Sequence, residues 1–376
     1  AGACGGITTF IDFAHHKPGE SPLQAMKDRI EEAKDQCFID YSFHMGMAEF
    51  TPENLAMIPQ FIEMGIPSFK LYMIYAKEGW MSNDSNTYDM LQAARQYGAL
   101  IMVHAENPFL IDNFTEKLQK ENKVDIPWLP VSRPHFVEIE AIKRALYLTE
   151  VTESRIYIVH VSTAEGASLI SEAKGRGVAA FGETCPQYLV LNESIYQKED
   201  AWLFTCNPPL RTPIDQAVLW ESISKGGLQI ISTDHCSFSR EQKTAGKLDF
   251  TKLPNGLPGI ETLMPLTFSE GVRKGMLTLN QWVDCLCTNP AKMFGLYPGK
   301  GNLSPGSDAD IVIFDPEKEV ELRPGVLHYA VDYTPFEGMT VTGWPVMTIS
   351  RGEVIYNNGK FSTDKGRGNF VPRYYD

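Results

Sequence analysis

The feature that most constrains the fold of this chain is a repeated alternation of short apolar runs with longer amphipathic stretches. Nearly continuous apolar runs separated by helices are typical of a parallel sheet covered on both faces. The strand-like runs occupy residues 7–14, 37–45, 67–73, 99–105, 155–161, 177–183 and 228–234. Helical spacing is found at residues 21–36, 51–65, 87–98, 132–152 and 163–177. Helix-start signals support this division at Ser21-Pro22, at Thr51-Pro52 and at Thr163.

Seven strand-helix units predict a TIM-like (β/α)8 barrel that lacks one unit. A barrel remnant of this kind would leave two long apolar edges unpaired. The chain opens with AGACGGITTFIDFA, has no initial Met and enters a strand pattern at once. We therefore expect that the first barrel strand is missing, that it lies before residue 1, and that the chain is a fragment or a processed product.

The sequence changes character after a helical segment at about residues 278–295. Residues 303–316 and 339–361 read as short strands with turns, and Asn357-Asn358-Gly359 is a hairpin signal. We expect residues 1–300 to form the barrel with its C-terminal helices. Residues 301–376 are expected to form part of a small β-sandwich domain and a C-terminal tail.

Charge and composition exclude several classes of partner. The net charge is -13 and no basic stripe is visible, which argues against a nucleic acid or an anionic membrane as partner. No apolar run reaches the roughly 18 residues of a membrane helix, and no signal peptide opens the chain. Seven cysteines without a CxxC pair predict reduced thiols in a cytoplasmic protein.

Four residues that could hold or serve a cation stand at the ends of predicted strands: Lys70, His104, His160 and Asp234. The carboxyl ends of barrel strands form one rim, and the active site lies on that rim. Imidazole nitrogen and carboxylate oxygen are natural zinc ligands, and divalent metals can both generate a hydroxide and polarise a carbonyl. Each residue alone could be a core histidine, a loop-capping aspartate or a buried lysine. Their joint occurrence predicts a metal-dependent hydrolase.

Other motifs carry less information. His15 and His16 follow a strand and are expected to serve a loop, whereas His44 ends a strand near the rim and His235 directly follows Asp234. The chain contains no GxSxG elbow and no glycine-rich phosphate loop. Serine hydrolase and nucleotide-binding functions therefore have no support from motifs.

A family resemblance extends over nearly the whole chain, in the order of the family's motifs. Its segments are FKLYMIY, VHAENPFLID, SRPHFVEIEAI, IVHVSTAEG, GETCPQYL, CNPPLR, STDHCSF, DFTKLPNGLPGIE, GSDADIVIFDP and VDYTPFEGM. With these segments the chain resembles the dihydropyrimidinase/hydantoinase branch of the amidohydrolase superfamily. The resemblance implies hydrolytic opening of a hydantoin or dihydropyrimidine ring at a C–N bond by a metal-bridged hydroxide, giving an N-carbamoyl amino acid.

The resemblance also implies a role for each candidate metal ligand. Lys70 would be carbamylated and would bridge two divalent ions, for which Zn²⁺ is expected. His104 and His160 would bind one ion. Asp234 would bind the other and would move a proton from the bridging hydroxide to the leaving nitrogen.

Three further residues would act on the substrate, a small cyclic amide. Tyr75, five residues after Lys70, would donate to the oxyanion of the tetrahedral intermediate. Asn207 and Asn255 would hold the ring through main-chain groups. The family is typically homotetrameric, so a tetramer is expected as well.

Departures from the family pattern leave alternatives open. The family's His-x-His pair would lie just upstream of residue 1, so we expect at most an incomplete binuclear site in the chain as it stands. Asn207 occupies a position where hydantoinases usually carry Ser, which favours an allantoinase or a dihydroorotase as the second reading. Collapsin response mediator proteins share the fold without the metal ligands, and they represent a non-catalytic alternative. The presence of Lys70, His104, His160 and Asp234 argues against that alternative.

Overall fold

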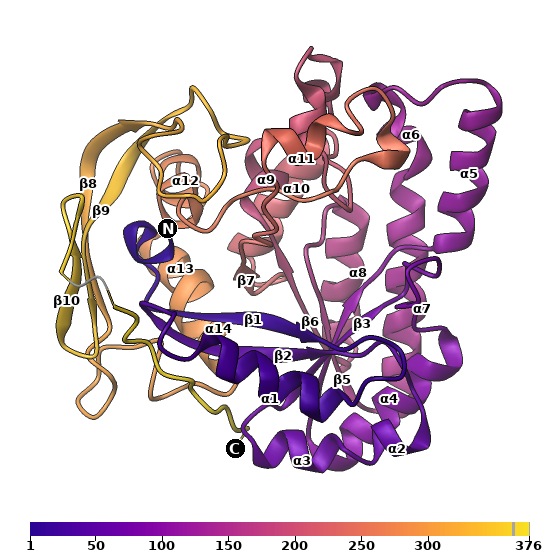
Figure 1. Ribbon diagram of the computed structural model, residues 1–376, viewed down its shortest axis with the longest axis horizontal. Helices are drawn as coiled ribbons and strands as arrows, with labels where there is room; N and C mark the ends of the chain where they lie inside the picture. The colour runs from indigo at the N-terminus through magenta and orange to yellow at the C-terminus, as the bar shows by residue number, and fades with distance from the viewer. Residues whose placement is uncertain (363–364, 376) are drawn as a thin grey trace.

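The computed structural model describes residues 1–362 and 365–375. Its centre is a curled parallel sheet whose strands lie side by side in chain order (Figure 1). Each strand pairs with the next one along the chain, as in a (β/α)8 barrel and unlike a doubly wound sheet, so the predicted fold class is confirmed. The strands are β1 (Thr9–His15), β2 (Asp40–Gly46), β3 (Ser68–Tyr72), β4 (Leu100–His104), β5 (Arg155–Ile158), β6 (Ala179–Thr184) and β7 (Ile230–Ile231).

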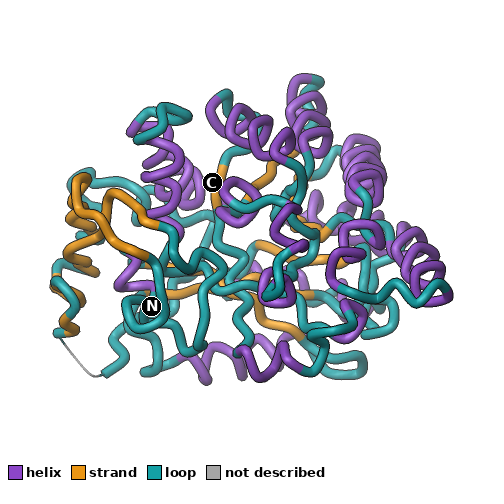
Figure 2. Tube along the Cα trace, turned by 90° about the horizontal axis from the view of Figure 1, so that it is seen from above, coloured by secondary structure: helices purple, strands orange, loops and turns teal. Residues whose placement is uncertain are grey.

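Helices surround the strands on the outside of this sheet (Figures 1 and 2). The predicted starts at Ser21, Thr51 and Thr163 are confirmed, because each side chain accepts a backbone N–H of the first helical turn. In the barrel region the helices are α1 (Pro22–Ala33), α2 (Pro52–Leu55), α3 (Ile58–Glu63), α4 (Asp84–Tyr97), α5 (Pro108–Lys120), α6 (Leu129–Ser132), α7 (His135–Thr152), α8 (Ala164–Gly175), α9 (Pro186–Val190), α10 (Pro213–Ser224), α11 (Arg240–Thr244), α12 (Leu263–Thr267), α13 (Leu279–Val283) and α14 (Asn289–Met293).

A separate antiparallel sheet lies beside the barrel, and the chain's first residues lie against it (Figure 1). The predicted turn is confirmed: Asn358 and Gly359 both have positive φ and join the last two strands as a hairpin. Thr348 Oγ1 donates to the carbonyl of Ala3 at 2.7 Å, which fixes the start of the chain to this sheet. The strands are β8 (Ile311–Glu321), β9 (Thr340–Ser350), β10 (Glu353–Asn357) and β11 (Lys360–Phe361). The domain boundary at residue 300 stays a prediction.

Several predicted boundaries were wrong. The strand expected at 155–161 ends at Ile158, and the one expected at 228–234 contains only Ile230–Ile231. The helix expected at 51–65 is divided into α2 and α3 because Pro59, at the start of α3, lacks the N–H needed to continue a helix. A π-helical turn at Asp284–Thr288 separates α13 from α14 within the segment predicted at 278–295.

The interior of the barrel is filled below the rim. Leu100 and Met102 alternate with outward-facing residues along β4, and they pack with Tyr157, Ile230 and Phe294 in one buried cluster. This cluster closes the barrel beneath the carboxyl ends of the strands. All seven cysteines are free thiols, as predicted. Among the described residues, no helix combines the length and apolarity that a membrane span requires.

Candidate metal centre

The alternation of side chains along each strand decides which residues face the barrel interior. His104 follows Leu100 and Met102 on the inner face of β4, and Lys70 and Tyr72 lie on the neighbouring β3, where Tyr72 pairs with His104. His104 ends its strand as predicted. Lys70 does not, because β3 continues to Tyr72. The side chain of Lys70 therefore reaches the rim from a position inside the strand.

The other two candidates lie beyond their strands. His160 follows the end of β5 and Asp234 follows the end of β7, and both have positive φ, 40° and 45°. Such φ values are uncommon for residues other than glycine and direct a side chain where regular strand geometry would not place it. The rings of His104 and His160 meet with centroids 4.5 Å apart, so the two histidines form one pair at the rim.

Buried opposite charges surround Lys70. Burial lowers the pKa of Lys70, and the nearby carboxylates of Asp234 and Glu183 act in the opposite direction. Burial also raises the pKa of Asp234. Among the described residues, no carboxylate forms an ion pair with Lys70, whose Nζ lies 5.6 and 5.2 Å from the ring centroids of Phe13 and Tyr72. The Lys70 amine is therefore shielded from water, and no carboxylate among the described residues contacts it directly.

The donor set fits a divalent cation. Nδ1 of His160 is buried and has no hydrogen-bond partner, which is costly for an imidazole unless a ligand occupies that position. Burial lowers the pKa of His104 and, more strongly, that of His160, so both rings are neutral and offer lone pairs. The ligand atoms of these histidines and Asp234 do not all lie within 4.8 Å of one another. The potential ligand atoms at the rim are thus farther apart than those of the closest groups of His, Cys, Asp and Glu side chains among the described residues.

Two such tight clusters lie elsewhere, and internal contacts satisfy both. Nζ of Lys300 occupies the centre of the group formed by Asp40, Asp308 and Asp310. In the group formed by Cys4, Glu261 and His328, the backbone N–H and the ring of His328 bind both oxygens of Glu261.

Tyr75 and Asn207, two of the three residues predicted to bind substrate, lie beside His104. Tyr75 has a positive φ of 69° and its ring lies 5.5 Å from that of His104. Its hydroxyl lies 3.5 Å from Nδ2 of Asn207. The side-chain oxygens of Asn207 and Asn255 are both buried without a partner. Unsatisfied acceptors of this kind are expected where a ligand supplies the missing donors.

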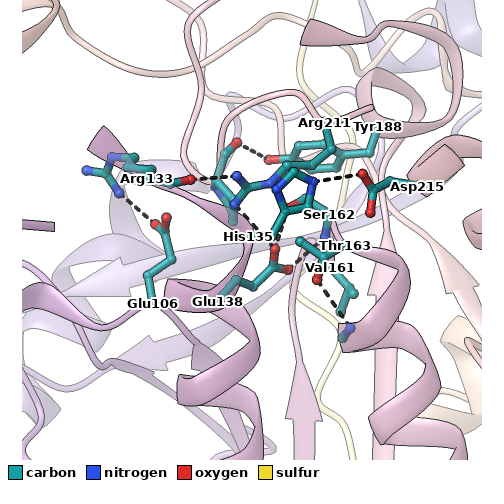
Figure 3. A network of polar contacts seen from close by, with 12 residues as sticks. Glu106, Arg133, His135, Glu138, Val161, Ser162, Thr163, Tyr188, Arg211 and Asp215 are labelled. Atoms are coloured by element: carbon teal, nitrogen blue, oxygen red, sulfur yellow. Dashed lines mark hydrogen bonds and ion pairs between the residues drawn. The ribbon is translucent and has the colours of Figure 1, made fainter. Parts of the chain in front are cut away.

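Three further residues near the site were not predicted from the sequence: Glu183, Glu106 and Arg133. Glu183 is the penultimate residue of β6 and accepts from the hydroxyl of Tyr157 at 2.7 Å. It ends a predicted strand, which is the criterion that selected the other residues, so the signal was present. Glu106 contacts His104. It also pairs with Arg133 (Figure 3). The spacing between Glu106 and Arg133 gave no signal of this pair.

The remaining histidines have structural partners. His16 accepts the N–H of Ala48 through Nε2, which agrees with the loop role expected for it. Nε2 of His15 lies 2.8 Å from the Tyr72 hydroxyl. His44 is buried and bonds to Ser68 Oγ at 2.6 Å. Nδ1 of His235 accepts from the backbone of Gly259, so His235 organises a loop next to Asp234.

Comparison with known proteins places the chain in a family. The model of the amidohydrolase family matches residues 3–355. A D-hydantoinase of Geobacillus stearothermophilus is 44% identical over 99% of this chain and 80% of its own length. A D-phenylhydantoinase of Escherichia coli is 39% identical over 99% of this chain and 81% of its own.

Solved structures agree with this placement. The crystal structure of dihydropyrimidinase from Brevibacillus agri NCHU1002 superposes with a TM-score of 0.97 at 40% identity, covering 99% of this chain and 81% of that one. The family implies a divalent metal centre, and the rim described above provides the donors for it. The chain belongs to the amidohydrolase family, within its hydantoinase and dihydropyrimidinase group.

Proposed function

We propose that this protein opens a cyclic amide, a hydantoin or a dihydropyrimidine, by hydrolysis of a ring C–N bond to give an N-carbamoyl amino acid. The observation that carries the proposal is the convergence of the buried Lys70, His104 and His160 with the partly buried Asp234 on one rim. The names of the relatives, D-hydantoinase, D-phenylhydantoinase and dihydropyrimidinase, support the choice of substrate class.

Lys70, His104, His160 and Asp234 would provide four of the ligands of two divalent cations, for which Zn²⁺ suits the nitrogen and oxygen donors. When bound, such ions activate water and polarise a carbonyl. Lys70 would take part as a carbamate. Its burial supports this role, because a lowered pKa leaves more of the amine neutral and able to react with carbon dioxide.

The chain's own groups would position the substrate and move the proton. The Tyr75 hydroxyl donates to the carbonyl oxygen as negative charge develops on it. Asn207 and Asn255 hold the ring through main-chain groups. Asp234 takes a proton from the attacking water and delivers it to the leaving ring nitrogen, a task that suits a carboxylate whose pKa is raised by burial.

A second candidate is an allantoinase or dihydroorotase activity, which Asn207 in CNPPLR favours. A non-catalytic, collapsin response mediator-like role has less support, because a binding protein has no chemical need for all four candidate ligands. We also propose a cytoplasmic homotetramer, with residues 1–300 as barrel and 301–376 as part of the β-domain and tail.

The substrate test uses the protein loaded with Zn²⁺ in bicarbonate buffer. We expect release of the N-carbamoyl product from a 5-substituted hydantoin or from dihydrouracil, followed by chromatography. Turnover of allantoin or dihydroorotate with neither of these would reject the leading proposal. Turnover of none of the four would favour the non-catalytic role.

The metal role of Lys70 has its own test. Lys70→Ala should lower activity more than about 100-fold and reduce bound zinc, since it removes a ligand. The matched control is Lys143→Ala, which removes an exposed lysine that pairs with Glu165. Full activity and zinc content in Lys70→Ala would refute the bridging role.

A further inference from the structure

We propose that Glu106, locked by Arg133, is a positioning residue that selects which ring nitrogen of His104 faces the metal. This inference rests on the proposed metal site. Nε2 of His104 lies 2.7 Å from Oε2 of Glu106, and both side chains are fully buried. A buried imidazole nitrogen this close to a carboxylate oxygen carries the proton and donates it. Nδ1 of His104 is then the nitrogen with the free lone pair.

Arg133 keeps Glu106 in place as an acceptor. Its Nη1 donates to the same oxygen, Oε2, at 2.7 Å, so two charge-assisted bonds converge on one atom. The other oxygen of Glu106, Oε1, is buried without a partner. Glu106 is therefore oriented entirely through the atom that contacts His104.

The lock extends to the loop that carries the second histidine. The carbonyl of Arg133 accepts from Nη1 of Arg211 at 2.6 Å, and Nε of Arg211 donates to Ser162 Oγ at 3.0 Å (Figure 3). Ser162 also donates its hydroxyl and its backbone N–H to the buried Glu138. A continuous network thus joins the loop after His104 to the loop after His160.

The first test reads the tautomer of His104 directly. In the metal-free wild-type protein with ¹⁵N-labelled histidine, we expect His104 to be protonated at Nε2, with Nδ1 unprotonated. Replacement of this one residue by Gln assigns its signals. Protonation at Nδ1 in the wild type would overturn the inference without any variant and without any assay of activity.

The second test measures Zn²⁺ and Co²⁺ affinity by competition with a chromophoric chelator. Glu106→Gln keeps the size of the side chain and removes its charge. The double variant Glu106→Leu with Arg133→Leu removes both members of the pair, so that neither charge is left buried alone. We expect both to bind metal roughly 10–100-fold more weakly and to change the visible spectrum of bound Co²⁺.

The matched control is Glu140→Gln. Glu140 accepts from Asn107, the neighbour of Glu106 in sequence, at 2.6 Å and does not contact His104. Its metal affinity should equal that of the wild type. Unchanged affinity in both Glu106 variants, or an equal loss in the control, would overturn the inference. Failure of the ring-opening assay alone would reject the proposed function and would leave the tautomer and affinity results to stand.

Discussion

At the scale of single residues, the candidate site contains unusual backbone conformations. Tyr75, His160 and Asp234 all have positive φ, and each comes from a loop that directly follows a strand of the barrel. Such conformations cost on the order of 1–3 kcal/mol each and persist only where the surroundings enforce them. Their concentration around one pair of histidine rings indicates that the loops are built to aim these side chains.

The proposed role of the Tyr75 hydroxyl can be tested by removing that one oxygen atom. Tyr75→Phe keeps the ring that packs near His104 and removes the hydroxyl proposed to donate to the oxyanion. We expect kcat to fall roughly 10²–10³-fold, as for the loss of other oxyanion donors, with little change in KM or in thermal stability. A rise in KM at constant kcat would instead assign the hydroxyl to ground-state binding.

At the scale of elements, the start of α10 connects three segments near the site. Asp215 accepts from the hydroxyl and backbone N–H of Thr212 in a capping box, from the N–H of Ala164 at 2.8 Å and from Nε2 of His135 at 2.9 Å. Burial would raise the pKa of Asp215, but these hydrogen bonds outweigh it and hold the pKa below its ordinary value.

Asp215→Ala should lower the free energy of unfolding at pH 7 by about 1–3 kcal/mol. The pKa of Asp215 is lower in the folded than in the unfolded protein. Its ionised carboxylate therefore stabilises the fold at any pH above the unfolded-state pKa of 3.8, and this stabilisation is lost as the pH falls toward the folded-state pKa. The difference between the free energies of unfolding of the wild type and the variant, measured by urea unfolding, should therefore become smaller below pH 3.8. A gap that stays constant between pH 7 and the acid limit of folding would contradict this assignment.

Elements also show what the sequence could and could not predict. Apolar runs and caps identified the strands and helix starts. Both patterns can be read from neighbouring residues, because a strand or helix is marked by the spacing of its own apolar side chains and by the capping residue that binds its first backbone N–H groups. The predicted ends of β5 and β7 were wrong. The chain leaves the sheet before His160 and Asp234, so both residues lie in loops and not in strands. The pair of Glu106 with Arg133 depends on tertiary packing between distant segments, and no local pattern encodes it.

At the scale of the whole molecule, a buried ionic cluster joins the barrel to the antiparallel sheet. Nζ of Lys300 lies 2.6 Å from Asp40 at the start of β2, 2.6 Å from Asp310 and 2.8 Å from Asp308. Arg351, in the turn between β9 and β10, also pairs with Asp40. Two cations thus face three carboxylates where β2 of the barrel meets the segment before β8 and the turn after β9.

Lys300→Met removes the cation at the centre of this cluster and leaves three carboxylates facing Arg351 alone. Since removing one partner of a buried ion pair leaves uncompensated charge, we expect the free energy of unfolding to fall by about 3–5 kcal/mol. The control, Lys225→Met, breaks an exposed pair with Glu221 and should cost less than about 1 kcal/mol. Asp308 is half-exposed, and Asp308→Asn relieves the excess negative charge, so it should cost little as well. Urea unfolding followed by tryptophan fluorescence measures all three variants. A small loss in Lys300→Met, equal to that of Lys225→Met, would mean that apolar packing alone holds the two sheets together.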